Sequence, residues 1–161
     1  MRSLRFGLFG LLMWALAAAA TGQAPNSSPT SAERRAVEEF TARFLTSFER
    51  LDMPAFIACF AEDATVFFPT PEPPERFSGR NAVQNHFQKV FDAIRSHAPS
   101  GPPYHRLNPE DEDVQLLSPD VAVVSFHLRN SERLARRTLV LKKAGGKWLI
   151  AHLHASNVAL N

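Results

Sequence analysis

Residues 145–157 read GGKWLIAHLHASN, and they are the strongest indication of the architecture. Two glycines predict a tight turn, and the residues after them alternate in character as a β-strand requires. One face of that strand carries Trp148, Ile150, His152, His154 and Ser156. A strand face that combines an indole, two imidazoles and a hydroxyl lines a cavity, an interface or solvent, so this stretch predicts a functional site.

Three more strands precede this one. Alternating residues and short turns predict an antiparallel meander with strands over 113–117, 121–129, 133–143 and 147–156. If the Gly-Gly pair is a two-residue turn, Leu139 faces His152 and Arg137 faces His154. A three-residue turn would shift the register by one residue and bring Arg136 to the site in place of Arg137.

The first half of the chain is predicted to be mainly helical. A capping box and apolar residues three and four apart indicate a helix over about 31–50. Asp52 caps a second helix that has Pro54 in its first turn. A short strand over 64–68 and a third helix over 80–97 follow. This order predicts an α+β domain in which three N-terminal helices pack on a curved, mainly antiparallel sheet.

The N-terminus has the features of an export signal. Arg2 and Arg5 precede an apolar run that ends in small residues near Ala20, so residues 1–20 are predicted to be a signal peptide. The run is shorter than the about 20 residues of a bilayer span, so no stable membrane span is expected after processing. Residues 21–30 predict a flexible leader. The protein is expected to be secreted or periplasmic, with one domain over residues 31–157.

The charge of the chain excludes one class of partner. The sequence has 18 Lys and Arg residues, and removal of Arg2 and Arg5 leaves 16 against 16 Asp and Glu residues. Because no basic run with interleaved aromatic residues is present, no nucleic-acid partner is expected. The one cysteine, Cys59, lies among apolar residues and is expected to be an inert, buried thiol. No cofactor is predicted.

Four motifs, in this order, resemble the nuclear transport factor 2-like superfamily, and within it SnoaL-like domains. They are LD at 51–52, FAEDATV at 60–66, SGRNAV at 78–83 and WLIAHLHAS at 148–156. The last motif is also similar to the association domain of calcium/calmodulin-dependent protein kinase II. The resemblance covers about residues 31–157. It implies a cone-shaped fold around a central cavity, often paired into homodimers through the sheet.

The same superfamily contains ketosteroid isomerase, and its acid–base positions can be compared with this chain. The resemblance places the catalytic base at Phe68 and the oxyanion tyrosine at Phe44, while the second oxyanion donor falls at Thr138 or Leu139. A benzyl group neither accepts a proton nor donates a hydrogen bond. The protein is therefore not expected to be a ketosteroid isomerase, and Phe44 and Phe68 are expected in the cavity wall.

The predicted ligand-binding residues come from the last strands. The kinase association domain has a cavity arginine at the position that resembles His127, while its second cavity arginine aligns with Leu139. The residues expected at the mouth of the cone are Ser125, His127, Arg129, Arg137, His152 and His154, and Trp148 is also expected to bind the ligand. The apolar residues that alternate with the polar set are expected to form the dimer contact: Ala122, Val124, Phe126 and Leu128.

These residues also have less specific interpretations. His152 and His154 suit polar residues that neighbouring backbone or a subunit interface satisfies, and Arg129 and Arg137 suit solvated charges at strand ends. Three imidazoles are typical ligands of hydrolytic zinc, but no accompanying carboxylate can be read from the sequence, so no metal site is predicted.

Three functions are compatible with this sequence. The first is an exported pocket protein that binds a small apolar molecule carrying an acidic or carbonyl group. The second is a lyase, isomerase or hydratase in which His152 or His127 acts as general base. The third is a non-catalytic association module that only oligomerises. The fold alone does not decide among them.

Overall fold

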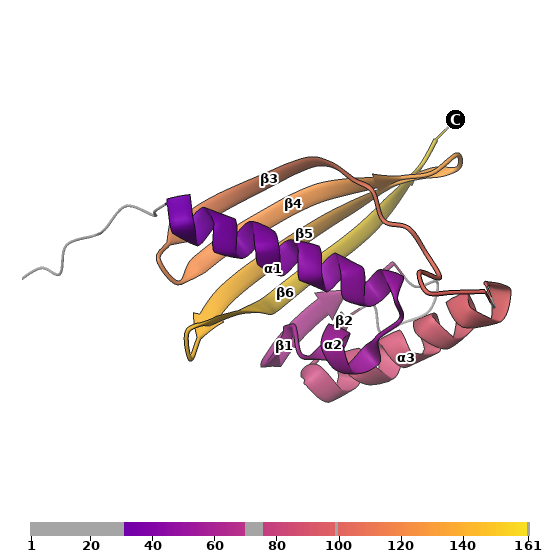
Figure 1. The fold of residues 1–161 in the computed structure, drawn as a ribbon, viewed down its shortest axis with the longest axis horizontal. Helices are drawn as coiled ribbons and strands as arrows, with labels where there is room; N and C mark the ends of the chain where they lie inside the picture. Colours follow the sequence, from indigo (N-terminus) through magenta and orange to yellow (C-terminus); the bar gives the residue numbers. More distant parts are fainter. Residues whose placement is uncertain (1–30, 70–75, 99, 161) are drawn as a thin grey trace, which may run out of the picture.

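The computed structural model describes residues 31–69, 76–98 and 100–160. The predicted signal peptide and leader lie outside these residues. In chain order the elements are α1 (Ser31–Glu49), α2 (Met53–Ile57), β1 (Phe60–Phe67), β2 (Arg76–Ser78), α3 (Arg80–His97), β3 (Pro109–Ser118), β4 (Val121–Arg129), β5 (Arg133–Ala144) and β6 (Lys147–Ala159) (Figure 1). None of the described helices has both the length and the apolar character of a membrane span.

One sheet of six strands, in the order β2-β1-β6-β5-β4-β3, organises the domain. The β1 and β6 strands are parallel, and the other neighbours are antiparallel. The long helix α1 crosses one face of the sheet, while α2 and α3 lie toward its β1 and β2 edge (Figure 1). The predicted α+β class, with three helices packed on a mainly antiparallel sheet, is confirmed.

Two features at the β1 edge differ from the prediction. The β1 strand begins at Phe60, before the predicted start at residue 64, and β2 was not predicted. The pairing of β1 with β6 is irregular between Phe60 and Thr65, and exposed acidic residues at 62 and 63 interrupt the alternation there. This irregularity hides the first half of β1 from a pattern of period two.

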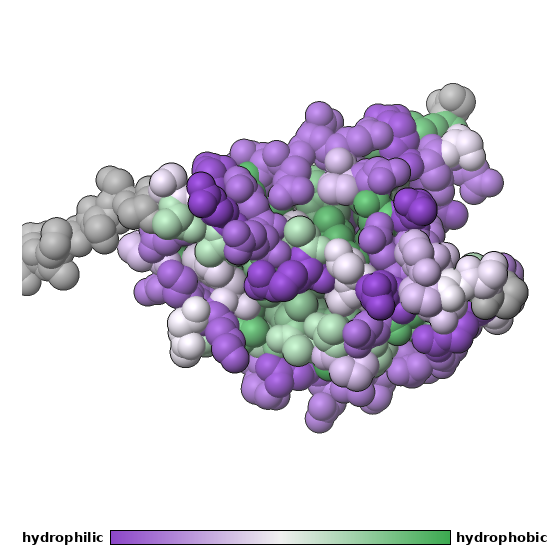
Figure 2. Space-filling view, in the orientation of Figure 1, coloured by the Kyte–Doolittle hydropathy of each residue, from purple (hydrophilic) through white to green (hydrophobic). Residues whose placement is uncertain are grey.

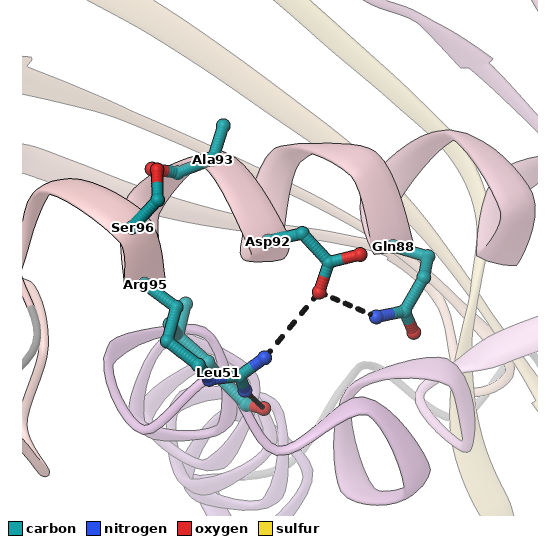
Figure 3. Close-up of polar contacts among 6 residues, drawn as sticks. All are labelled: Leu51, Gln88, Asp92, Ala93, Arg95 and Ser96. Carbon is teal, nitrogen blue, oxygen red and sulfur yellow. Dashed lines mark hydrogen bonds and ion pairs between the residues drawn. The ribbon is translucent and has the colours of Figure 1, made fainter.

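The turn between α1 and α2 holds the helices together. Asp52 caps α2 as predicted, because its Oδ1 accepts a hydrogen bond from Ala55 N at 3.0 Å. Arg95 of α3 donates from Nη2 to the carbonyl oxygen of Leu51 at 3.5 Å, and its Nη1 lies 3.4 Å from Oδ1 of Asp92 (Figure 3). The contact between Arg95 and Leu51 fastens the end of α3 to the α1–α2 turn.

Phe56 is at the centre of an aromatic core. Its side chain is fully buried, and its ring centroid lies 4.7 Å from that of Phe87 and 5.3 Å from that of Phe44. The rings of Phe60 and Phe91 both lie at 5.2 Å. Rings at these separations stabilise one another beyond the area that they bury, so α1, α2, α3 and β1 form one rigid wall.

The β5–β6 hairpin turns through two glycines at positive φ, 56° at Gly145 and 74° at Gly146. This backbone conformation costs glycine little because it has no Cβ, and two such residues suit the tight turn of a hairpin. The predicted two-residue turn is confirmed, and Leu141 lies opposite Ile150 as expected.

Beyond this pair the predicted register is wrong by one residue. The β6 strand has a bulge in which Ala151 is the extra residue, so His152 lies opposite Val140 and not opposite Leu139. On the β1 side, Ile150 pairs with Phe60 and His152 pairs with Thr65, so the bulge lies between these two pairs. Because side chains alternate between faces, the extra residue moves His152 and His154 to the face that points away from the helices.

Candidate functional site

A cavity in two connected parts lies between the helices and the sheet. The deeper part, here the inner chamber, has a volume of about 80 Å³. The part that opens to solvent, here the outer basin, has a volume of about 440 Å³. The two parts share Phe68, Leu107, Leu128 and Arg137 in their walls.

The inner chamber is almost entirely apolar. Helices and strands both contribute its remaining lining residues, which are Phe44, Leu45, Phe48, Phe56, Phe87, Phe126, Leu139 and Leu153. Phe44 and Phe68 occupy the positions where the resemblance places the oxyanion donor and the base of ketosteroid isomerase. Both are therefore part of an apolar wall. Within the described part of the chain, Arg137 is the one charged residue in this lining.

The face of β4 that lines the cavity is the opposite of the predicted one. Ala122 and Val124 are fully buried and Phe126 is 3% exposed, and all three belong to the core beneath the helices. The expectation that these residues form a dimer contact is wrong. The Phe-rich helices cover the apolar set of β4, which leaves Ser125 and His127 on the outer face of the sheet.

Residues 100–108, here the strap, form one side of the outer basin. The carbonyl oxygen of Glu49 accepts a hydrogen bond from Tyr104 N at 2.8 Å, and its Oε1 accepts one from Leu107 N at 2.7 Å. The Arg95 guanidinium also lies 5.6 Å from the centroid of the Tyr104 ring. Both sides of His105 and Arg106 are thus anchored, and these two residues line the basin.

Arg137 lies at the junction of the chamber and the basin. Its Nη1 donates to the carbonyl oxygens of Arg136 at 2.8 Å and Ser156 at 3.2 Å. Its Nε and Nη2 have no partner among the described residues, and no described Asp or Glu lies within ion-pair distance. Burial lowers the pKa of Arg137 to about 10, which leaves it charged at neutral pH.

The outer basin has a positive lining. Besides Arg137 it includes His105, Arg106, Arg129 and Arg133, and no acidic residue of the described chain lines it. Arg129 pairs with a carboxylate outside the lining at 3.1 Å, and Arg133 does so at 3.8 Å. On the face that carries α1, apolar surface lies in hollows between hydrophilic residues (Figure 2). A basin of this kind attracts anions.

His152 and His154 do not reach the cavity. His152 Nδ1 lies 2.7 Å from Thr65 Oγ1, and Thr65 lies beside it on the outer face of the sheet. The Phe67 ring packs beside both imidazoles, at 5.6 Å from His152 and 6.0 Å from His154. Burial, and then the positive charge of His154, lower the pKa of His152. The less specific interpretation of a satisfied polar residue therefore fits His152.

The other predicted residues divide between the two faces. Ser125 and His127 lie opposite Thr138 and Arg136 on the outer face, and His127 Nδ1 is 3.2 Å from Asp111. Trp148 is 7% exposed and lines a separate groove between α1, α2 and the hairpin. Four of the predicted residues line the cavity: Phe44, Phe68, Arg129 and Arg137.

The strap residues are the part of the site that sequence reasoning missed. Prolines and a glycine over 101–109 conceal any periodic pattern, so nothing in that segment pointed to the cavity.

A second observation concerns metals. Over residues 31–69, 76–98 and 100–160, no three His, Cys, Asp or Glu side chains are grouped as metal ligands.

Comparison with known families agrees with this geometry. The sequence profile of the SnoaL-like domain family matches residues 37–161. The chain belongs to this family. A SnoaL-like domain of this fold is a ligand-binding or enzymatic domain. No curated protein matches the chain.

Solved structures show the same fold. A nuclear transport factor 2-like protein of unknown function from Pseudomonas putida KT2440 is 19% identical, with a TM-score of 0.67 over 80% of this chain and 89% of that one. A ketosteroid isomerase-like protein from Erwinia carotovora atroseptica SCRI1043 is 21% identical, with a TM-score of 0.66 over 81% of this chain and 100% of that one. At these identities the likeness concerns the fold alone. The SnoaL-like domain is a nuclear transport factor 2-like cone, as predicted.

Proposed function

We propose that this SnoaL-like domain binds a small molecule that has an apolar end and an acidic or carbonyl group. The observation that supports this function is Arg137, a half-buried guanidinium with two free donor nitrogens and no carboxylate partner in the described chain. A cation placed in this way is costly unless an acceptor completes its hydrogen bonds. A carboxylate matches the free side of a guanidinium in both charge and shape.

The sizes of the two parts limit the ligand. The inner chamber offers about 80 Å³ of apolar space, whereas the outer basin offers about 440 Å³ among arginines and asparagines. The apolar end is therefore small, comparable to one ring or a short alkyl chain, and the acidic or carbonyl group meets Arg137 at the junction. The rest of the ligand lies in the positive basin.

The enzymatic alternative loses its proposed base. His152 and His127 both lie on the outer face of the sheet, so neither contacts a molecule in the cavity. Lyase, isomerase or hydratase chemistry with either histidine as general base is not supported, because a general base must be within hydrogen-bond reach of the proton that it takes. Binding is the function that the arrangement of residues supports best.

Benzenesulfonate is a suitable probe, because its ring fits the chamber and its sulfonate stays ionised. NMR titration of the mature domain should show shifts around Arg137 and Leu107. Arg137→Gln should weaken binding about tenfold or more through loss of charge-assisted hydrogen bonds. Arg136→Gln is the matched control, since Arg136 is the next residue and points to the other face.

Benzenesulfonamide provides a second control. It has nearly the same shape and no charge near neutral pH, so Arg137→Gln should change its binding by less than about threefold. Equal binding of benzenesulfonate to wild type and to Arg137→Gln would overturn the proposed function.

Export is a second part of the proposal. The support is sequence based: a basic start, an apolar run and small residues near Ala20. The protein is proposed to be secreted or periplasmic, with a mature chain that begins near Thr21. Mass spectrometry of native protein that retains residues 1–20 would contradict this.

The outer face of the sheet suits a homodimer. It carries half-buried apolar residues on the central strands, and Phe67 and Val158 there are 38% and 36% exposed. The half-buried residues are Val121, Val123, Leu134 and Val140. An apolar surface of this kind favours a partner, and a second copy offers the same surface. Light scattering that gives a monomer mass at micromolar concentration would count against the dimer.

A further inference from the structure

One imidazole is positioned to contact a ligand in the cavity. Among the described residues, His105 is the one histidine that lines either the inner chamber or the outer basin. Its side chain is exposed to the basin, and its ring lies 6.4 Å from the ring of Phe48, which belongs to the chamber wall. The two hydrogen bonds to Glu49 hold the backbone on both sides of it, so the ring stays near the opening.

The charges around His105 determine how it responds to a ligand. Arg106 on the strap, Arg129 on β4, Arg133 at the start of β5 and Arg137 on β5 line the same basin. Glu49 of α1 and Arg95 of α3 contact the strap at Leu107 and Tyr104. In the empty basin the arginines oppose an added positive charge. A bound anion reverses that balance and favours the imidazolium.

We propose that His105 is a ligand-contact residue of the outer basin and that its protonation couples anion binding to pH. The inference rests on the proposed function of the cavity, in which Arg137 holds the acidic group. It adds a pH dependence to that function, which Arg137 cannot supply because it remains charged throughout the physiological range. Histidine is the side-chain type whose charge can change within that range.

The coupling works through linkage. A group that binds its proton more tightly in the complex than in the free protein makes the ligand bind more tightly as pH falls. The expected ligands are therefore small anions with an apolar end that stay ionised at pH 5.5. A strong acid serves as a clean probe, since its own charge is constant and every change with pH comes from the protein.

The test measures benzenesulfonate binding by NMR at pH 7.5 and 5.5. Wild-type affinity should rise about three- to tenfold on acidification, which is the effect of one added charge several ångströms away in a partly solvated site. In His105→Gln the change should fall below about 1.5-fold. His154→Gln, whose ring lies on the outer face, should behave as wild type.

Two further measurements separate the possible failures. The His105 ring signals should report a pKa that rises when benzenesulfonate binds, and a pKa that stays constant or falls would overturn the inference. Full pH dependence retained in His105→Gln, or lost equally in His154→Gln, would also overturn it. If the role of His105 fails but Arg137→Gln binds benzenesulfonate more weakly than wild type, the proposed cavity function still stands. If Arg137→Gln binds benzenesulfonate as tightly as wild type, both the cavity function and the role of His105 are overturned.

Discussion

Glu49 holds Leu107 against the end of α1. Its Oε1 accepts a hydrogen bond from Leu107 N at 2.7 Å, and its carbonyl oxygen accepts one from Tyr104 N at 2.8 Å. One residue therefore anchors both sides of the strap section that lines the basin. Because Leu107 also belongs to the inner chamber wall, this contact positions both parts of the cavity.

Glu49→Ala should loosen the strap. We expect the free energy of unfolding to fall by about 1–3 kcal/mol, since the Leu107 N–H loses a charged acceptor. Urea denaturation measures this loss, and limited proteolysis should cut residues 100–108 faster than in wild type. Glu49→Gln keeps an acceptor oxygen and should recover part of the stability. Glu39→Ala, at an exposed position on the same helix, is the control, and a strap cut no faster in Glu49→Ala than in Glu39→Ala would contradict the prediction.

Arg137→Met should not destabilise the domain, although Arg137 is the proposed ligand-binding residue. The folded-state pKa of Arg137, about 10, lies below its ordinary value because of burial, so the charge costs folding free energy at every pH below about 10. After allowance for the solvated part of the side chain, we expect the variant to be as stable as wild type or up to about 2 kcal/mol more stable. Thermal unfolding at pH 7 measures this. A loss of more than about 1 kcal/mol would show that its two backbone hydrogen bonds outweigh the cost of burial.

Apart from β2, the presence of the elements and most of their ends follow from the sequence. The helices show apolar residues three and four apart, and the four long strands alternate between turns. The faces of the sheet do not follow. Sequence reasoning placed the polar residues of β4 in the cavity, but Phe44, Phe48 and Phe87 on the helices require an apolar surface opposite them, and the Ala122–Leu128 set supplies it.

The bulge at Ala151 is the second reason why the sequence does not predict the faces of the sheet. Alanine suits either face of a sheet, so nothing in the alternation reveals an extra residue there. Arg137 was expected in the cavity through a pairing with His154, and that pairing is wrong because Thr138 lies opposite His154. It reaches the cavity because it alternates with Ala135 and Leu139 on the covered face. The position of the strap depends on hydrogen bonds to Glu49. Because Glu49 is distant from the strap in the sequence, these contacts leave no local pattern.

His86 should make the domain less stable in acid. Burial, and then the charge of Lys89, lower its pKa below the unfolded value of 6.5, and its Nε2 is buried without a hydrogen-bond partner in the described chain. The unfolded chain therefore binds the proton more readily, so stability is complete above about pH 6.5 and falls as pH decreases toward the lowered pKa. The same direction applies to His152.

His86→Phe tests this contribution. The imidazole stacks on Phe77 at 4.1 Å and packs against Phe68 at 4.8 Å, so a phenyl ring keeps the apolar contacts and removes the unpartnered nitrogen. We expect stability at pH 7.5 to be unchanged or higher by up to about 1 kcal/mol, and the loss between pH 7.5 and 5.5 to be smaller than in wild type. His97→Gln, at an exposed position on the same helix, should keep the wild-type profile. A His86→Phe profile that parallels wild type would show that other groups cause the acid sensitivity.

Val123→Lys should dissociate the proposed homodimer. Val123 lies opposite Val140 at the centre of the outer face, so a lysine there places a charge in the contact between two copies. Light scattering at micromolar concentration should give a dimer mass for wild type and a monomer mass for the variant. Gln84→Lys adds the same charge at an exposed position of α3 and should remain a dimer. Because the cavity lies on the opposite side of the sheet, the Val123→Lys monomer should still bind benzenesulfonate at Arg137. Loss of that binding would indicate a misfolded variant, and a dimer mass for a correctly binding Val123→Lys would rule out this face as the interface.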